Sequence, residues 1–290
     1  MELRYVVENN KYKDINQVLK KEFNISSRLL SKLINNHKVL LNSKPSDTRS
    51  IIKENDVVQV LLDNEEDNSN IIPTKIKLDI VYEDEGMLVI NKPAGIAIHP
   101  SLRHYTDSLS NGVKYYFDEI DLKRKIRPVN RLDLGTSGLV IFAKNEYIQE
   151  CLIRQMEKGI FKKEYLCIVC GTLEKNKGTI EAPIKRKNNS IIERCIASNG
   201  KPSITHYSVE KKYKDYTLVR CSIETGRTHQ IRVHMAYIGH PLLGDTLYGT
   251  KTDLISRQAL HCYKLSFINP ATKNKQIINS PLPEDFIEIL

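Results

Sequence analysis

The sequence predicts an α+β fold, in which a large mixed, mainly antiparallel sheet is joined to a small N-terminal α/β domain. After residue 76 the chain is rich in strand-like apolar runs with few helical stretches, and it has few regular strand–helix–strand repeats. Before that point, residues 63–70 form a short acidic segment without apolar anchors, which is typical of a linker. A chain of 290 residues is also long for a single core. We therefore predict a small domain at 1–62, an acidic linker at 63–75 and a larger domain at 76–290.

The small domain begins with two predicted helices. Ile15, Val18 and Leu19 recur at helical spacing. Ser26 or Ser27 can then cap a second helix, whose apolar face is formed by Leu29, Leu30, Leu33 and Ile34. Strands are predicted next at residues 39–41 and 57–60, with a turn at 42–45.

Basic side chains gather on the polar face of the second helix. Arg28 and Lys32 lie on this face, and Lys38 follows just beyond it. Such a cluster is either a solvated helix surface or a surface that binds a polyanion, and the helix taken alone supports both interpretations equally.

The larger domain opens with a predicted hairpin, in which residues 80–82 and 88–90 flank an acidic turn. A sharp turn at 91–95 leads into a further apolar run at 96–98. Other strands are predicted at 139–143, 165–170, 204–209, 216–223 and 262–268. Helices fit best near 146–158 and 228–238. Thr228 is the expected N-cap of the second of these, and Gly239 with Pro241 ends it.

The chain is basic, with a formal net charge of +9 and a pI of about 9.1. Both predicted domains have an excess of Lys and Arg, and the acidic side chains of the linker separate them. A basic surface favours binding of a polyanionic partner. Lys123-Arg-Lys125 and Lys185-Arg-Lys187 are candidate clusters for such a partner, or simply solvated loops.

The sequence has no apolar run of about 18 residues and no apolar N-terminal segment of signal-peptide length, so we expect a cytoplasmic protein that does not bind membranes. Its six cysteines are scattered through apolar, strand-like contexts. Cys167 and Cys170 form a Cys-x-x-Cys within a predicted strand, where alternation points the two thiols to opposite faces. We therefore expect reduced structural thiols and no metal site.

The most informative stretch is Val-Asn-Arg-Leu-Asp-Leu-Gly-Thr-Ser-Gly at residues 129–138. It places Asp133 in a tight turn before a strand, with Arg131 two residues earlier. An aspartate in such a turn usually accepts hydrogen bonds from backbone N–H groups. The alternative is a catalytic carboxylate displayed at the mouth of a sheet, and the rest of the chain decides between the two.

Three further segments decide between a structural and a catalytic role for Asp133. They are Asn91-Lys-Pro-Ala-Gly-Ile-Ala-Ile-His-Pro100, Lys163-Glu-Tyr-Leu-Cys-Ile-Val-Cys-Gly171, and Thr225-Gly-Arg-Thr-His-Gln-Ile-Arg-Val-His234 with the following Ile238-Gly-His-Pro-Leu-Leu-Gly-Asp245. Together with residues 129–138 they resemble, in order, the motifs of the RluA/RluD-type pseudouridine synthases. The resemblance covers nearly all of the region from about 76 to 290.

This resemblance implies an isomerase that converts specific uridines in RNA to pseudouridine, with Asp133 as the nucleophile. It places Tyr165 against the uracil ring and assigns to Arg232 a bidentate pair with the Asp133 carboxylate. Arg131, Arg227 and His229 are then expected to contact RNA, although a solvated cationic face would also explain the last two. No nucleotide or metal cofactor is expected, because an isomerisation needs no group donor and the sequence has no phosphate-binding glycine motif.

The small domain also shows a resemblance. Its Ser-Arg helix start, Leu33-Ile34 and Val39-x-Leu41-Asn42 resemble the small RNA-binding domain first described in a small-subunit ribosomal protein. That family usually has glycine where this chain has His37 and Ser43, so we expect left-handed backbone at both. The resemblance implies that Arg28, Lys32 and Lys38 bind RNA.

The combined architecture is similar to bacterial synthases that modify large-subunit ribosomal RNA, and we expect a monomer that acts on such RNA. The alternative is a non-catalytic RNA-binding or ribosome-assembly factor on the same scaffold, which should have lost Asp133, Tyr165 or Arg232. One departure touches the central motif, because many family members have histidine where this chain has Asn130. Asparagine can hydrogen-bond locally but does not titrate near neutral pH.

Overall fold

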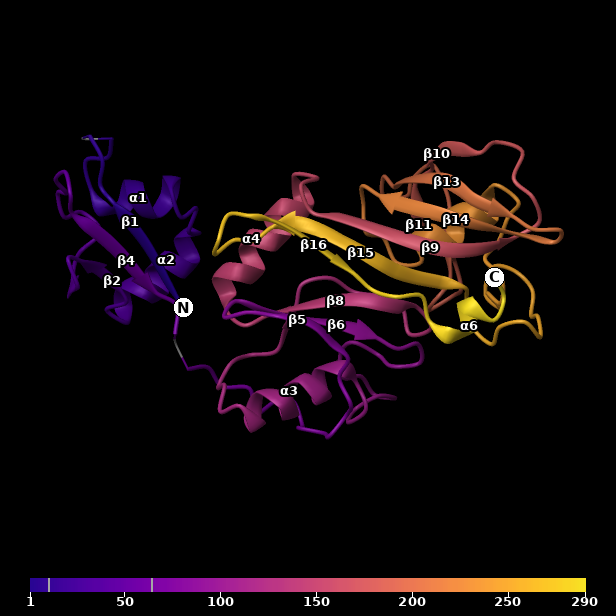
Figure 1. Ribbon diagram of the computed structural model, residues 1–290, viewed down its shortest axis with the longest axis horizontal. Coiled ribbons are helices and arrows are strands. Elements are labelled where there is room, and N and C mark those ends of the chain that lie inside the picture. The colour runs from indigo at the N-terminus through magenta and orange to yellow at the C-terminus, as the bar shows by residue number, and fades with distance from the viewer. Residues whose placement is uncertain (10, 64) are drawn as a thin grey trace.

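The computed structural model describes residues 1–9, 11–63 and 65–290, and a ten-stranded sheet dominates it (Figure 1). Its strands are β5 (Ile80–Glu83), β6 (Met87–Lys92), β7 (Arg127–Pro128), β8 (Ser137–Ala143), β9 (Lys162–Cys170), β10 (Lys177–Glu181), β13 (Ile204–Lys212), β14 (Tyr216–Ile223), β15 (Leu260–Ile268) and β16 (Lys275–Asn279). The order is β10-β13-β14-β9-β15-β8-β6-β5, with β16 beside β15 and β7 beside β8. The pair β15–β8 is parallel and the other described pairs are antiparallel, which confirms the predicted α+β fold with a mixed, mainly antiparallel sheet.

Two helices cover opposite faces of the β6–β8 part of this sheet. Alternate side chains of a strand point to opposite faces, so Val89 packs in one core with α4 (Glu146–Glu157) and Ile90 packs in another with α3 (Leu109–Glu119). The predicted helix near 146–158 is confirmed by α4, which Asn145 caps. Three shorter elements complete this part of the chain: α5 (Gln230–Tyr237), α6 (Glu284–Ile287) and the ribbon of β11 (Ile184–Arg186) and β12 (Arg194–Ile196).

The N-terminal residues form a separate four-stranded sheet with two helices. Its elements are β1 (Glu2–Val6), α1 (Ile15–Lys21), α2 (Ser27–Asn35), β2 (Val39–Leu41), β3 (Lys44–Pro45) and β4 (Val57–Leu61). Both helices and both strands predicted here are confirmed, and Ser26 is the N-cap of α2. His37 and Ser43 have φ angles of 54° and 66°, so both lie in the left-handed region as expected. The division of the chain at residues 62 and 75 stays a prediction.

Two local predictions in the larger domain are wrong. Residues 96–98 do not form a strand, because the turn after β6 turns away from the sheet and Gly95 donates its N–H to Leu134 O at 2.9 Å. Thr228 is not the N-cap of α5. His229 takes that place with left-handed backbone, φ 58° and ψ 20°, and makes no side-chain cap bond.

Candidate active site

The loop that carries Asp133 is fixed to β8 by Asn130. The Asn130 side chain is buried, its Nδ2 donates to Leu139 O at 3.0 Å, and its Oδ1 accepts from Ile141 N at 2.9 Å. The amide therefore replaces a rung of the strand ladder and satisfies two buried backbone groups. This is the structural role of the asparagine that stands where many family members have histidine.

A second anchor holds the far side of the same loop. Lys92 is fully buried, and its Nζ donates to Pro93 O, Ile96 O and Leu134 O at 2.8, 2.9 and 3.2 Å. Burial lowers the pKa of Lys92 to about 7, whereas the three carbonyl oxygens favour its charged form. Lys92 therefore fixes the backbone of Leu134, the residue that follows Asp133.

The start of β8 requires glycine. Gly138 has a φ of +111°, and a Cβ there would lie 2.3 Å from the carbonyl oxygen of Cys262 on β15. Only glycine allows the backbones of β8 and β15 to approach this closely. This close approach brings the Asp133 loop next to the centre of the sheet.

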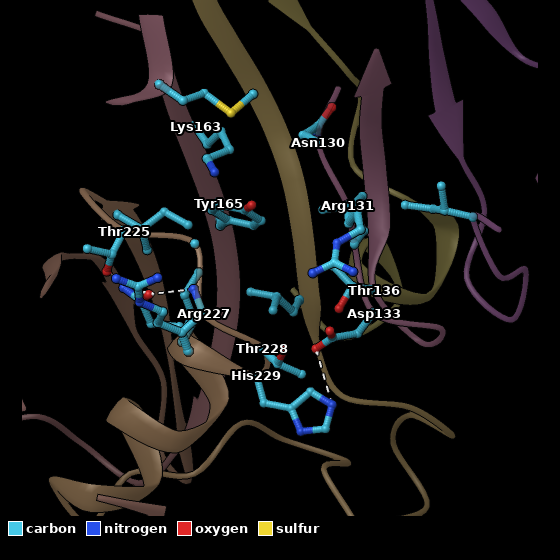
Figure 2. A pocket seen from close by; sticks show the side chains of 18 of the residues that line it. Asn130, Arg131, Asp133, Thr136, Lys163, Tyr165, Thr225, Arg227, Thr228 and His229 are labelled. Carbon is cyan, nitrogen blue, oxygen red and sulfur yellow. Dashed lines mark hydrogen bonds and ion pairs between the residues drawn. The ribbon is translucent and has the colours of Figure 1, made fainter. Parts of the chain in front are cut away.

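Asp133 lies on the wall of a cavity of about 790 Å³. The walls come from the Asp133 loop, from β9 and from residues 223–232, which run from the end of β14 into the first turn of α5. Figure 2 shows Tyr165 on β9 facing the cavity, with Asp133 and His229 at one end and Lys163 at the other. Burial raises the pKa of Tyr165 well above that of a free phenol, so its hydroxyl is protonated at neutral pH.

Arg232 on α5 lies between two carboxylates. Its Nε and Nη2 donate to the two oxygens of Asp245 at 2.7 and 2.9 Å, and its Nη1 reaches Asp133 Oδ2 at 3.4 Å. The predicted bidentate pair with Asp133 is therefore wrong, because the fork of the guanidinium is filled by Asp245, which is fully buried. Asp133 receives a single N–H of Arg232, and its side chain is 26% exposed.

His229 completes the surroundings of Asp133. Its Nε2 lies 3.9 Å from Asp133 Oδ2, and its Nδ1 lies 2.7 Å from the hydroxyl of Tyr248. That hydroxyl accepts the N–H of Arg194 at 2.8 Å, and we assign its own proton to the bond with Nδ1, which places the imidazole proton on Nε2, toward Asp133. Burial lowers the pKa of His229, which favours this neutral form.

Two exposed arginines stand at the rim of the cavity. Arg131 lies beside Asp133 in Figure 2, and Arg227 lies across from it on the loop before α5. Arg227 Nε donates to Pro202 O at 3.2 Å, which fixes its direction but leaves its charge without an acidic partner among the described residues. Both retain their charge for an anionic ligand, and their contact with RNA stays a prediction.

The basic residues of the small domain lie away from this cavity and have acidic partners. Arg28 and Lys32 on α2 form ion pairs with Glu146 at the start of α4, and Ser26 Oγ donates to Glu150 on the same helix at 3.0 Å. Lys38 pairs with Asp63 at 3.0 Å. Binding of RNA by these three basic side chains also stays a prediction.

Sequence reasoning did not single out Asp245 and Tyr248, which contact Arg232 and His229, or Lys163, which lines the cavity. Asp245 ends one of the segments on which the family resemblance rests, which was the available signal, but spacing alone could not pair it with Arg232 thirteen residues earlier. Tyr248 lies outside every recognised segment. Lys163 opens the segment that contains Tyr165, and its position two residues away on a strand predicts the same face.

The cysteines are free thiols. Cys167 is fully buried with its Sγ 3.6 Å from that of Cys221, whereas Cys170 is half-buried. Within residues 1–9, 11–63 and 65–290, no group of three or more His, Cys, Asp or Glu side chains is arranged to hold a metal ion. In the same part of the chain, the helices are too short or too polar to cross a membrane.

Comparison with known proteins points to one family. The family model of RNA pseudouridylate synthases matches residues 86–237, which include Asp133, Tyr165 and Arg232. The uncharacterized RNA pseudouridine synthase YjbO of Bacillus subtilis (strain 168) is 38% identical over 270 residues, or 93% of this chain and 95% of the relative. The ribosomal large subunit pseudouridine synthase D of Neisseria meningitidis serogroup A is 35% identical over 265 residues, or 87% and 71% of the two chains.

Solved structures show the same relationship. The human RNA pseudouridylate synthase domain containing 1 superposes with a TM-score of 0.60 and 28% identity, over 72% of this chain and 85% of that one. The human RNA pseudouridylate synthase domain containing 4 superposes with a TM-score of 0.59 at 20% identity, which supports the fold.

Proposed function

The chain belongs to the RNA pseudouridine synthases of the RluA/RluD type, and we propose that it isomerises specific uridines of large-subunit ribosomal RNA with Asp133 as the nucleophile. The observation that carries this proposal is the place of the Asp133 carboxylate. It lies on the wall of the cavity, opposite Tyr165, with one N–H of Arg232 at 3.4 Å and His229 Nε2 at 3.9 Å.

The reaction breaks the bond between C1′ of the ribose and N1 of uracil and forms a bond between C1′ and C5. The proton on C5 is lost and N1 gains a proton, so substrate and product have the same atoms and the same oxidation state. The chemistry therefore needs a nucleophile that can bond and depart, and a pocket that holds the detached base. An ionised aspartate is suited to the first task.

Asp133 is held ready for this role by groups that leave one side of it open. Asn130 and Lys92 fix the loop from two sides, and Arg232 with His229 supplies N–H groups directed toward the carboxylate. A carboxylate held in this way loses little orientational freedom when the substrate arrives.

Tyr165 supplies the platform for the base. Its ring is buried in the wall that β9 forms, across the cavity from Asp133, and its hydroxyl stays protonated. An aromatic ring there can pack against a uracil that has been flipped out of the RNA stack. Tyr165 can therefore keep the base near C1′ while its N1 and C5 exchange places.

The rim of the cavity fits an RNA substrate. Flipping a nucleotide costs a few kcal/mol, which cationic contacts with the phosphates can offset. Arg131 and Arg227 stand on either side of the opening with their charges exposed. We assign these two arginines to the phosphates that flank the target nucleotide, and Arg28, Lys32 and Lys38 to RNA further away.

The choice of large-subunit ribosomal RNA rests on relatives whose names state that substrate. It is tested by mapping pseudouridine in all RNA of a strain that lacks the gene, complemented with wild type, Asp133→Asn or the surface control Asp253→Asn. We expect one or more pseudouridines of the large-subunit RNA to disappear and to return with wild type and the control only. Restoration by Asp133→Asn would instead favour a non-catalytic RNA-binding or assembly factor.

A further inference from the structure

Lys163 is a lysine in the cavity wall that the reaction described above does not use. It lies two residues before Tyr165 on β9, so both side chains point to the same face, roughly 7 Å apart along the strand. Its Nζ reaches toward the loop before α5, because a Cβ on Gly226 would lie 3.3 Å from it. Figure 2 shows Lys163 on the side of Tyr165 that is away from Asp133.

The charge of Lys163 has no protein partner in the part of the chain that the structure describes. Its neighbour Glu164 points to the other face of β9, where it pairs with Lys264 at 2.7 Å. Lys163 itself forms no ion pair or side-chain hydrogen bond with the described residues, and burial lowers its pKa. An ammonium carries three donors and no acceptor, and Lys163 is half-buried in the cavity wall, so its unpaired N–H groups are available to a ligand that supplies an acceptor.

The order of the side chains along the cavity indicates which acceptor that is. Figure 2 shows Tyr165 between Lys163 on one side and Asp133 on the other. When the ribose C1′ lies at Asp133 and the uracil ring at Tyr165, the base points its far edge toward Lys163. The phosphates leave the ribose on the other side, toward Arg131 and Arg227 at the rim.

We propose that Lys163 donates a hydrogen bond to the O4 carbonyl oxygen of the target uracil and so both selects and activates the base. This assignment rests on the proposed function and identifies the group that the site recognises. Cytosine carries an amino donor where uracil carries O4, so an ammonium at this place attracts uracil and opposes cytosine. Lys163 is therefore a specificity-determining residue.

The same contact assists the chemistry on either route. When the C1′–N1 bond breaks, its electron pair moves onto the base and spreads to O4. When a nucleophile adds instead to C6, the pair of the C5–C6 double bond moves to C5 and O4. In both cases negative charge develops at O4, and the ammonium of Lys163 stabilises it while keeping all of its own protons.

The test pairs a change in the protein with a change of one atom in the RNA. Unmodified transcripts of large-subunit ribosomal RNA are made with either uridine or 4-thiouridine triphosphate, and the initial rate of isomerisation is followed by mass spectrometry of nucleosides. Sulfur at position 4 is a weak acceptor, so we expect wild type to act about 10- to 100-fold more slowly on the thio-RNA. Lys163→Met should show a similar loss on the uridine RNA and almost no further loss on the thio-RNA.

Controls separate this role from binding and folding. Lys162→Met changes the exposed neighbouring lysine and should behave as wild type. The dissociation constant of each transcript, measured across salt concentrations, should keep its slope in Lys163→Met, because O4 is not a phosphate. The melting temperature should not fall, since Lys163 is half-buried and its replacement by methionine breaks no ion pair with the described residues.

Three results would overturn the proposal. The first is a rate of isomerisation in Lys163→Met equal to that of wild type. The second is a loss of rate on the thio-RNA that is as large in Lys163→Met as in wild type. The third is a salt dependence of RNA binding in Lys163→Met whose slope is reduced by about one, which would indicate a phosphate contact instead. If wild type formed no pseudouridine in the uridine RNA, the proposed function would fail together with this inference. If wild type is active and Lys163→Met isomerises the uridine RNA at the same rate, only the inference about Lys163 is overturned and the proposed function stands.

Discussion

Arg232 is bound more firmly to Asp245 than to Asp133. Two of its N–H groups donate to Asp245 at 2.7 and 2.9 Å, and a third reaches Asp133 at 3.4 Å. Asp245 therefore sets the position of the guanidinium, and the Asp133 carboxylate stays partly exposed, as the proposed nucleophile requires. Asp245 is also held by the backbone N–H groups of Leu247 and Tyr248, at 3.0 and 3.3 Å.

Replacing Asp245 should damage both stability and rate. In Asp245→Asn the buried Arg232 loses its charged partner, which typically costs about 3 kcal/mol of unfolding free energy. We expect the single-turnover rate of isomerisation to fall at least tenfold while the dissociation constant for RNA changes little. Urea unfolding and single-turnover kinetics check this, with Asp253→Asn as the surface control. A rate equal to that of wild type would show that Arg232 needs no such support.

Tyr248 is predicted to fix the tautomer of His229. Its hydroxyl accepts from Arg194 N and donates to His229 Nδ1, so removal of the hydroxyl in Tyr248→Phe frees the imidazole to exchange its proton between the two nitrogens. Nitrogen NMR of histidine-labelled protein should show an unprotonated Nδ1 in wild type and a mixture in Tyr248→Phe. The rate should fall in parallel. A protonated Nδ1 in wild type would contradict the assigned network.

His261 should make the fold sensitive to acid. Burial lowers its pKa to about 4 in the folded protein, and its ordinary value is 6.5. The unfolded chain therefore binds more protons between these two values, so stability is fully present above pH 6.5 and falls as the pH drops toward 4. The loss is roughly 3 kcal/mol.

Urea unfolding at pH 7 and pH 4 measures this loss. The matched variant His261→Asn has no titrating group at this position, so its unfolding free energy should fall by roughly 3 kcal/mol less than that of wild type over the same range. Equal losses in the two proteins would show that protonation of His261 does not matter.

The contact between the small domain and α4 should compete with RNA. Glu146 pairs with Arg28 and Lys32, whose side chains are 78% and 46% exposed, so the pairs contribute little to stability. In Glu146→Gln both cations become available, and we expect RNA to bind more tightly at low salt with a steeper salt dependence. Filter binding checks this. An unchanged slope would mean that these two side chains do not contact RNA.

The main strands of the sheet could be predicted because each is an apolar run bounded by turn residues. The strand runs at 139–143 and 216–223 both lie within strands of the structure. Helix α3 escaped prediction. Its sequence contains Gly112, which weakens a helix, and the helix is stabilised by packing, since a Cβ at Gly112 would lie 3.0 Å from Ile76 on the segment after the linker.

In the candidate site, the main residues could be located from the sequence, but their contacts could not. Motif resemblance located Asp133, Tyr165 and Arg232, and the structure brings all three to one cavity. The partner of the guanidinium fork could not be predicted, because pairing depends on how the chain after α5 turns back toward it. Asn130 could not be understood from the sequence for the same reason, since both of its hydrogen bonds are made with backbone groups of β8.

The central claim is that the carboxylate of Asp133 performs the isomerisation. It is tested most directly by release of tritium from large-subunit ribosomal RNA labelled at C5 of uracil, because formation of the C1′–C5 bond expels that hydrogen. Wild type and the surface control Asp253→Asn should release tritium at equal rates, and Asp133→Asn, which keeps the size of the side chain but removes the nucleophilic carboxylate, should release none. Equal release by Asp133→Asn and wild type would contradict the account.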